Sequence, residues 1–555
     1  MYQQKIIQIL LCFLCVLLVS TIPIAESLGT PHAQSDNKTI IHTQTQTTTN
    51  TIKPGEIIDI SFSTRYPSLD EPMFIDITIM GNPFGHPFYE LIEIIDEYYG
   101  IIASPQGIRV IFGELPVTSG IILITRMPRQ TVTIEYYPSI IGNHTLKFRA
   151  GCHPEKIEYL TVGFNQDGIM YPSIGCPQII SRDEENQLVI LLSEQRDNHA
   201  DAITLYEVLL QDTTTHATYT LDQNTEHYRF WIHRGNTRRE DELIIHCSID
   251  AIPNGLYDLY VRTERKQYSW KHAVQIQNSE PCQYTVVHLT DIHIGKAYTP
   301  FFEQLRFRRI LSYITKNIQP AFILITGDIV DWANTKNHHQ NFYQRFHHLI
   351  EQSTIPIYTL PGNHERYEHR FIRGYRPYIN MQGYHRYLNP FNDYAFEYGN
   401  ITYICLDSGY DLSRLDRGIT PEASGLTTTQ LHLLTQYFGD THLCQIIAMH
   451  HPAVNDKNDK GFQSIPNPYP SGNNECITKN RQDFITYCVH HNVAVVLSGH
   501  SHKNKVLDSI GKPIVDQQQH PAFIQTASST RSRNGILRTI TVANGTVVDY
   551  ALSTL

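Results

Sequence analysis

Five apolar segments between residues 284 and 502 each end in side chains that commonly bind metal ions. The segments are YTVVHLTDIH, AFILITGD, IPIYTLPGNH, LCQIIAMHH and VAVVLSGHSH, and their end groups are Asp291 and His293, Asp328, Asn363 and His364, His450 and His451, and His500 and His502. Near-continuous apolar runs indicate strands buried on both faces. Helices are predicted between them, at about 301–317, 338–352 and 479–491. The C-terminal half is therefore expected to be an α/β domain.

Strand ends of this kind can meet even when they lie far apart in the chain. In open α/β sheets, ligands bind at the carboxyl ends of the strands. Imidazole suits Zn, Fe, Mn and Co, while carboxylate and amide oxygens suit harder ions, and one carboxylate can bridge two cations about 3.5–4 Å apart. Gly327, Gly362 and Gly499 leave room where the backbone turns beside these groups. Each motif alone is weak, but together they predict a site for two divalent cations.

The same groups resemble, in order along the chain, the motif set of the calcineurin-like metallophosphoesterases. The matching motifs are Asp291-x-His293, Gly327-Asp328, Gly362-Asn363-His364-Glu365, His450 and Gly499-His500-x-His502. The resemblance covers about 284 to 505 and does not extend to the residues before it. It implies a domain over 282–555 that folds as a four-layer α/β/β/α sandwich with a dinuclear metal site between two sheets.

The resemblance also implies a role for each site residue. One cation would be held by Asp291, His293 and His502, the other by Asn363, His450 and His500, and Asp328 would bridge them. His364 would be catalytic: it faces the substrate phosphate and protonates the leaving oxygen or stabilises charge. His451 is left as a spare near the site, and Glu365 and Arg366 are interpreted as turn or surface groups. The two divalent metal ions would be Mn, Zn, Fe or Co.

One position departs from a branch of this family. The purple acid phosphatases have a tyrosine three residues after the bridging aspartate, and this chain has Asp331 there. A coloured Fe(III)-tyrosinate site is therefore not expected. Asp331 is interpreted as a helix-start residue or a residue behind the ligands.

The implied activity is hydrolysis of a phosphoester, with the dinuclear metal centre activating water for attack on phosphorus. The motifs position the phosphate and not its substituents. A monoesterase and a phosphodiesterase, including a nucleotidase or a phospholipid-headgroup hydrolase, therefore remain open. A non-catalytic cell-surface binding protein with a structural metal site is a further alternative. His364 argues against it, because a structural site is closed and needs no such group.

Residues 53 to 281 contain short strand-like runs separated by Gly and Pro, which is typical of β-sandwiches. We expect one β-sandwich-like domain over 53–177 and a second, Ig- or FnIII-like, over 178–281. The segment FYELIEIIDEYYG, at 88–100, interrupts the pattern and is predicted to be a helix.

The first residues have the pattern of an export signal. Lys5 precedes an apolar stretch from Ile6 to Val19, and small residues at 25 and 27 suit a cleavage site. Residues 1–27 are thus predicted to be a signal peptide or an N-terminal anchor, followed by a flexible Thr/Gln-rich linker over 28–52. Both interpretations place the rest of the chain outside the cell or on its surface, and an uncleaved anchor would tether it to the membrane.

Charge and cysteine content limit the remaining possibilities. The formal net charge of −10 argues against broad nucleic-acid binding, and no nucleic-acid-binding surface is evident. The sequence leaves the oligomeric state open. Eight cysteines follow the leader, and an even count in an exported chain permits disulfides. The local pairs expected are Cys152 with Cys176, Cys247 with Cys282, and Cys476 with Cys488.

Overall fold

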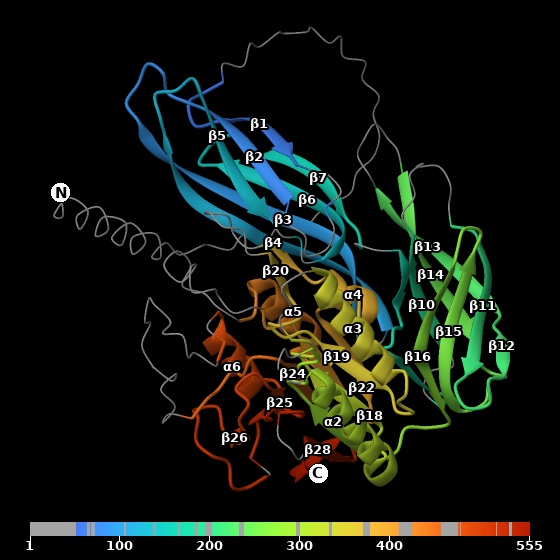
Figure 1. The fold of residues 1–555 in the computed structure, drawn as a ribbon. Helices are drawn as coiled ribbons and strands as arrows, with labels where there is room; N and C mark the ends of the chain where they lie inside the picture. The colour runs from blue at the N-terminus through green and yellow to red at the C-terminus, as the bar shows by residue number, and fades with distance from the viewer. Residues whose placement is uncertain are drawn as a thin grey trace, which may run out of the picture. The chain divides into compact units, whose positions relative to one another are not determined.

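Figure 1 shows the computed structural model of the chain. It describes residues 52–63, 67, 73–104, 107–136, 138, 140–164, 167–183, 187–194, 203–231, 238–295, 300–331, 336–369, 378–409, 425–456, 476–477, 479–517, 519–531 and 535–555. The predicted leader (1–27) and the predicted linker (28–52), except its last residue, lie outside the described residues. In the part of the chain so described, no helix is long and apolar enough to cross a membrane.

Two antiparallel sheets form the first β region. The smaller has the order β1 (Ile57–Phe62), β2 (Met73–Met80), β5 (Arg129–Tyr136), and the larger the order β4 (Gly107–Ile124), β3 (Phe88–Ser104), β6 (Ile141–Ala150), β7 (Lys156–Val162). Strand β2 shows why they pack together: every second residue, from Met73 to Ile79, is buried. These side chains share one hydrophobic cluster with Ile92 of β3 and Phe148 of β6.

The predicted helix at 88–100 is wrong, because these residues lie in strand β3. Glu93 is paired with Ser119 of β4 on one side and with Arg149 of β6 on the other. Ile92 and Ile94 are buried in the core, so the apolar period here is two. The glutamates between the isoleucines favour a helix locally, but pairing on both edges overrides that preference.

A second pair of sheets follows. One has the order β13 (Gln223–Trp231), β14 (Arg238–Ser248), β10 (Gln187–Ser193), β8 (Gly168–Tyr171), and the other the order β12 (Thr218–Thr220), β11 (Leu205–Asp212), β15 (Gly255–Thr263), β16 (Gln267–Gln277), β9 (Gln178–Ser181). Residues from both sheets form one buried cluster, for example Leu192, Ile245 and Val261. This region is thus rich in β structure with a core of its own.

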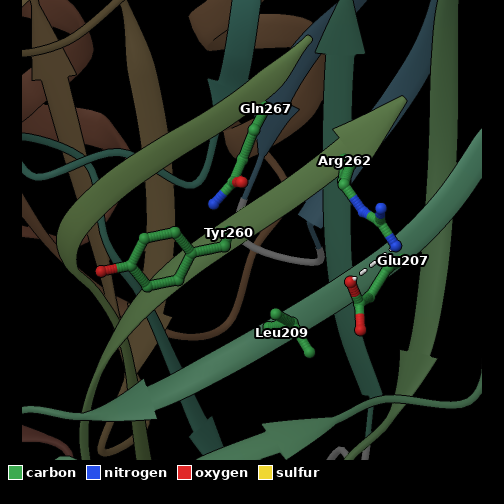
Figure 2. A pocket seen from close by; sticks show the side chains of 5 residues that line it. All are labelled: Glu207, Leu209, Tyr260, Arg262 and Gln267. Carbon is green, nitrogen blue, oxygen red and sulfur yellow. Dashed lines mark ion pairs between the residues drawn. The ribbon is translucent and has the colours of Figure 1, made fainter. Parts of the chain in front are cut away.

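A pocket of about 320 Å³ lies over strands β11, β15 and β16 (Figure 2). It is lined by Glu207, Leu209, Tyr260, Arg262 and Gln267. The neighbouring residues Val208 and Val261 point into the core, so the lining residues occupy the opposite face of the sheet. Arg262 lies 3.1 Å from the carboxylate of Glu207, and the two charges therefore balance each other.

The expected disulfides do not form. Cys152, Cys176, Cys247, Cys282 and Cys488 are free thiols, and each of the three expected pairs includes at least one of them. In two pairs, one thiol is buried and the other exposed. Burial also raises the pKa of Cys247 to about 12, which opposes the ionisation that disulfide exchange requires.

Two further sheets make up the C-terminal half. The first has the order β19 (Ile357–Leu360), β18 (Phe322–Thr326), β17 (Gln283–Leu289), β28 (Ile536–Ala543), β29 (Thr546–Thr554). The second has the order β22 (Tyr394–Tyr398), β23 (Ile401–Leu406), β24 (Cys444–Met449), β25 (Val493–Ser498), β27 (Ala522–Gln525), β26 (Lys505–Leu507). Strands β20 (Tyr367–His369) and β21 (Tyr378–Asn380) form a separate antiparallel pair. The helices are α2 (Pro300–Tyr313), the π-helical η1 (Ile314–Ile318), α3 (Lys336–Ile350), α4 (Gln382–Tyr387), α5 (Thr428–Phe438) and α6 (Arg481–His490).

Alternate residues of the central strands enter different cores, and this defines four layers. In β18, Phe322 and Leu324 join a cluster shared with the second sheet, whereas Ile323 packs among residues of α2 and α3. In β25, Val496 packs among residues of α5 and α6. The order is therefore helices, sheet, sheet, helices. This confirms the predicted four-layer α/β/β/α sandwich and the β-rich sheets before it.

The parallel strands bring their carboxyl ends together. Strands β17, β18 and β19 are parallel neighbours in one sheet, and β23, β24, β25 and β27 in the other. Beyond the strands, the N–H of Asp291 bonds the carbonyl of Gly327, and the N–H of Gly499 bonds the carbonyl of His450. The loops that carry the predicted site residues are thus joined by backbone hydrogen bonds.

Candidate metal centre

The backbone at these strand ends is unusual. Five residues with side chains adopt positive φ angles: Asp291 (54°), His293 (54°), Asp328 (49°), His500 (62°) and His502 (54°). This conformation is uncommon outside glycine and costs on the order of 1–3 kcal/mol per residue. All five residues lie in the loops after β17, β18 and β25. Such a concentration of strained backbone indicates a functional site rather than an ordinary loop.

Asp328 lies at the centre of the cluster and is buried. Its Oδ1 is 3.2 Å from Nε2 of His450, and its Oδ2 is 3.8 Å from Nε2 of His293. The two oxygens of one carboxylate therefore face imidazoles that come from different sheets. Oδ1 also accepts a hydrogen bond from the backbone N–H of His364 (3.0 Å), which fixes the carboxylate in this orientation.

Three predicted ligands lie on one side of Asp328. Nε2 of His502 is 3.0 Å from Oδ1 of Asp291 and 3.3 Å from Nε2 of His293. Nε2 of His293 is 3.8 Å from the same carboxylate oxygen. These atoms all lie within 4.8 Å of one another, close enough to hold a single cation.

Three more predicted ligands lie on the other side. Oδ1 of Asn363 is 2.9 Å from Nε2 of His450 and 3.2 Å from Nδ1 of His500. His451, the spare imidazole of the sequence motif, is buried beside them with its ring centroid 4.3 Å from that of His500. The structure therefore brings together all seven residues predicted as metal ligands. Their individual roles as ligands stay a prediction.

Two features of this arrangement fit bound cations. Oδ2 of Asp291 accepts hydrogen bonds from the Thr290 hydroxyl (2.8 Å) and the His500 N–H (3.0 Å), so its buried Oδ1 is the oxygen that faces His502 and His293. A buried carboxylate oxygen that faces two imidazoles suits a cation held between them. In His450, Nδ1 lies 2.8 Å from the Thr326 carbonyl and must donate to it, so Nε2 is the nitrogen that faces the cluster.

The electrostatics point the same way. Burial alone would raise the pKa of Asp328, but the imidazoles of His364 and His450 hold it well below its usual range. Burial would lower the pKa of His450, but the Asp328 carboxylate raises it to about 10. The cluster thus favours positive charge around an ionised Asp328, which two divalent cations would supply.

His364 stands next to the ligands with a carboxylate behind it. Its Nε2 is 3.7 Å from Oδ2 of Asp328, and its Nδ1 is 3.1 Å from Oδ1 of Asp331. Burial would lower the pKa of His364, but the Asp328 and Asp331 carboxylates raise it above its ordinary value. Asp331 therefore orients the ring and favours its protonated form, so it belongs to the site rather than to a helix start.

The interpretation of Glu365 and Arg366 as turn or surface groups is wrong. Both are buried. Glu365 accepts hydrogen bonds from the backbone N–H groups of Gly362 (2.6 Å), Asp328 (2.7 Å), Ile329 (2.8 Å) and Val330 (3.2 Å). Arg366 donates to the Gly362 carbonyl (3.0 Å) and pairs with Asp407. These side chains hold the loops after β18 and β19 against each other.

Residues 526–531, which follow β27, also belong to the site although no sequence motif singles them out. The hydroxyl of Ser528 donates to the Asp291 carbonyl (2.6 Å), and that of Thr530 donates to the Ile292 carbonyl (2.7 Å). The N–H of Ser529 bonds the Thr290 carbonyl (2.9 Å). The signal in the sequence is the run SST after an apolar strand, because such hydroxyls bond nearby backbone groups.

Three comparisons with known proteins show what this chain is similar to. The family model described as calcineurin-like phosphoesterase matches residues 284–504. Solved structures similar to this chain include a protein of Thermus thermophilus, with 11% identity over 49% of this chain and 98% of that chain (TM-score 0.29). A cold-active protein-tyrosine phosphatase of a psychrophilic Shewanella species has 17% identity over 54% and 96% (TM-score 0.22). A β-glucosidase of Listeria innocua has 13% identity over 19% and 16% (TM-score 0.16). A search of the curated proteins returned no match.

Fold, site and family match define a metal-dependent phosphoester hydrolase. Residues 284–504 are a calcineurin-like phosphoesterase domain, and a β-rich region precedes it.

Proposed function

We propose that this chain hydrolyses phosphoesters at a dinuclear metal centre built around Asp328. The observation that carries the proposal is the placement of this carboxylate, with Oδ1 3.2 Å from His450 and Oδ2 3.8 Å from His293. A carboxylate whose two oxygens face two ligand groups suits a bridge between two cations. The sequence-predicted assignment follows, with one cation on Asp291, His293 and His502 and the other on Asn363, His450 and His500.

The metal ligands and His364 would have separate roles in the hydrolysis. When bound, two divalent cations would draw in phosphate oxygens and activate water for attack on phosphorus. His364 faces the same space and, held by Asp331 at 3.1 Å, is poised to give its proton to the leaving oxygen as the ester P–O bond breaks. A water proton would then restore the imidazolium. A purely structural metal site would have no use for such a group, and this supports catalysis over binding alone.

We also propose that the enzyme works outside the cell. The support is the sequence pattern of residues 1–27, which exports the chain whether it is cleaved or retained as an anchor. The preceding β domains, over 53–177 and 178–281, would then be extracellular modules. Within this proposal, the metals of the centre are drawn from Mn, Zn, Fe or Co. The assay below distinguishes the substituents on the phosphate.

A panel of chromogenic phosphate monoesters and diesters tests this function. The full chain would be stripped of metal with a chelator and then assayed with and without added Mn²⁺ or Zn²⁺. We expect no hydrolysis by the stripped protein and recovery when about two equivalents are added, with the preferred ester separating phosphatase from phosphodiesterase. A protein that holds two cations and hydrolyses none of the esters would instead favour the cell-surface binding role.

A further inference from the structure

Arg531 is the last of residues 526–531, and its side chain reaches a predicted metal ligand. Its side chain is exposed, and Nη1 lies 2.6 Å from Nδ1 of His502. Its backbone N–H bonds the hydroxyl of Ser528 (3.2 Å), which itself donates to the Asp291 carbonyl. The backbone of Arg531 is thus linked through Ser528 to the loop that carries Asp291. Its guanidinium contacts His502, a second predicted ligand.

The backbone that carries Arg531 is held on two sides. Thr530 donates its hydroxyl to the Ile292 carbonyl, and its own carbonyl accepts a hydrogen bond from Nη1 of Arg306 (2.8 Å) on α2. Residues 526 to 530 are buried. A guanidinium on such a base has a restricted range, so less freedom is lost when it binds a ligand.

The charge of Arg531 is not balanced by the residues that the structure describes. Within them, the only side chain that its guanidinium hydrogen-bonds is the His502 imidazole, and no carboxylate pairs with it. Arg366, by contrast, is paired with Asp407 on the other side of the site. In a chain with a formal net charge of −10, an exposed and unpaired guanidinium beside the predicted metal ligands is available to bind an anion from outside.

We propose that Arg531 binds the phosphate group of the substrate at the half of the centre formed by Asp291, His293 and His502. A guanidinium presents parallel N–H donors that match two phosphate oxygens. Arg531 lies beyond the residues that match the family model, so this contact belongs to the present chain's own C-terminal segment. The inference rests on the proposed phosphoesterase function and names a substrate-binding residue for it.

The contact with His502 does not compete with this role. Because a guanidinium only donates hydrogen bonds, the contact leaves the His502 proton on Nε2. A cation bound through Nε2 needs the lone pair on that atom, so the proton must then sit on Nδ1. Arg531 can no longer donate to Nδ1 in that state, and its guanidinium is left available to phosphate.

Binding of inorganic phosphate to the full chain loaded with Mn²⁺ tests the inference by calorimetry, without requiring turnover. We expect Arg531→Met to weaken the Kd about 10- to 100-fold, as loss of a charged hydrogen-bonding pair predicts, and Arg531→Lys to have a smaller effect. The matched control is Arg308→Met, which removes another exposed arginine, on α2. It should leave the Kd unchanged. Metal content, measured by mass spectrometry, should be the same in all variants.

An unchanged phosphate Kd in Arg531→Met overturns the inference. Loss of a cation in that variant also overturns it, because Arg531 would then act only by positioning His502. Failure of the proposed function looks different: the Mn²⁺-loaded wild type would bind phosphate in an Arg531-dependent way and still hydrolyse no phosphoester.

Discussion

Oε2 of Glu365 lies 2.7 Å from the backbone nitrogen of Asp328, and the same oxygen lies 2.6 Å from the nitrogen of Gly362. One buried side chain therefore fixes the distance between the loop of Asp328, the proposed bridging carboxylate, and the loop of Asn363 and His364. Burial and the nearby Asp328 carboxylate raise the pKa of Glu365 to about 7, although its backbone N–H partners favour the ionised form. Glu365 thus holds the loops of the site together from a buried position.

Glu365→Gln should weaken metal binding more than its small change in size suggests. The amide NH₂ of glutamine would face backbone N–H groups, so at least one donor that Glu365 now satisfies would lose its acceptor. Changes behind metal ligands typically cost about 10- to 100-fold in affinity. Competition with a metal-binding dye would measure the effect. Glu351→Gln, at a surface ion pair with His347, should leave the affinity unchanged, and equal affinities in all three proteins would refute a supporting role for Glu365.

His364→Ala should separate catalysis from metal binding. This imidazole is not needed to hold a cation in the proposed arrangement, so two cations per chain should remain. Loss of a general acid typically lowers the rate about 100- to 10,000-fold, and kcat should fall by that order. Steady-state kinetics and elemental analysis of the same sample provide both values. Loss of the cations together with activity would show that His364 is a ligand and that its assigned role is wrong.

Asp331→Asn should change the pH profile of the enzyme. The Asp328 and Asp331 carboxylates raise the pKa of His364, so removing the charge of Asp331 lowers it. If His364 acts as a protonated acid, activity falls as pH rises through its pKa. The alkaline limb of the kcat profile should therefore move to lower pH in Asp331→Asn, while metal content is unchanged. An alkaline limb at the same pH in both proteins would show that Asp331 does not influence the catalytic acid.

Local sequence was sufficient to predict which side chains meet at this site, for a physical reason. Each group directly follows an apolar strand, and parallel strands of one sheet share a carboxyl edge, so Asp291, Asp328 and His500 were expected to meet. The four layers follow from the same runs, because a strand such as β18 buries both faces.

The parts that sequence did not predict depend on distant partners. Glu365 looks like a turn residue until the loop of Asp328 is placed against it. Ser528 and Arg531 belong to a Ser/Thr-rich stretch with no recognisable motif. Their role becomes clear only from their contact with the loop of Asp291, over 200 positions earlier. The helix predicted at 88–100 is wrong because its glutamates suit a helix locally, whereas the pairing of β3 with β4 and β6 decides the outcome.

Gly499 should be required because of close packing rather than turn geometry. A Cβ at this position would lie 1.9 Å from Oγ1 of Thr290 and 2.5 Å from Oδ2 of Asp291. Gly499→Ala should therefore lower the free energy of unfolding by about 1–3 kcal/mol, as overpacking does, and reduce metal content by displacing Asp291. Urea denaturation would measure the first effect. Gly120→Ala is the matched control, because a Cβ there meets nothing within 4 Å, and equal results for the two variants would contradict the packing argument.

The central claim is that Asp328 joins two cations in one site. It is tested most directly by counting metal ions per chain, by mass spectrometry, in the wild type and in Asp328→Ala after equilibration with the same excess of Mn²⁺. Asp440→Ala, at an exposed carboxylate after α5, is the control. We predict two ions in the wild type and the control, and loss of both in Asp328→Ala because the bridge and its charge are gone. Two ions retained in Asp328→Ala, or none in the wild type, would contradict the account.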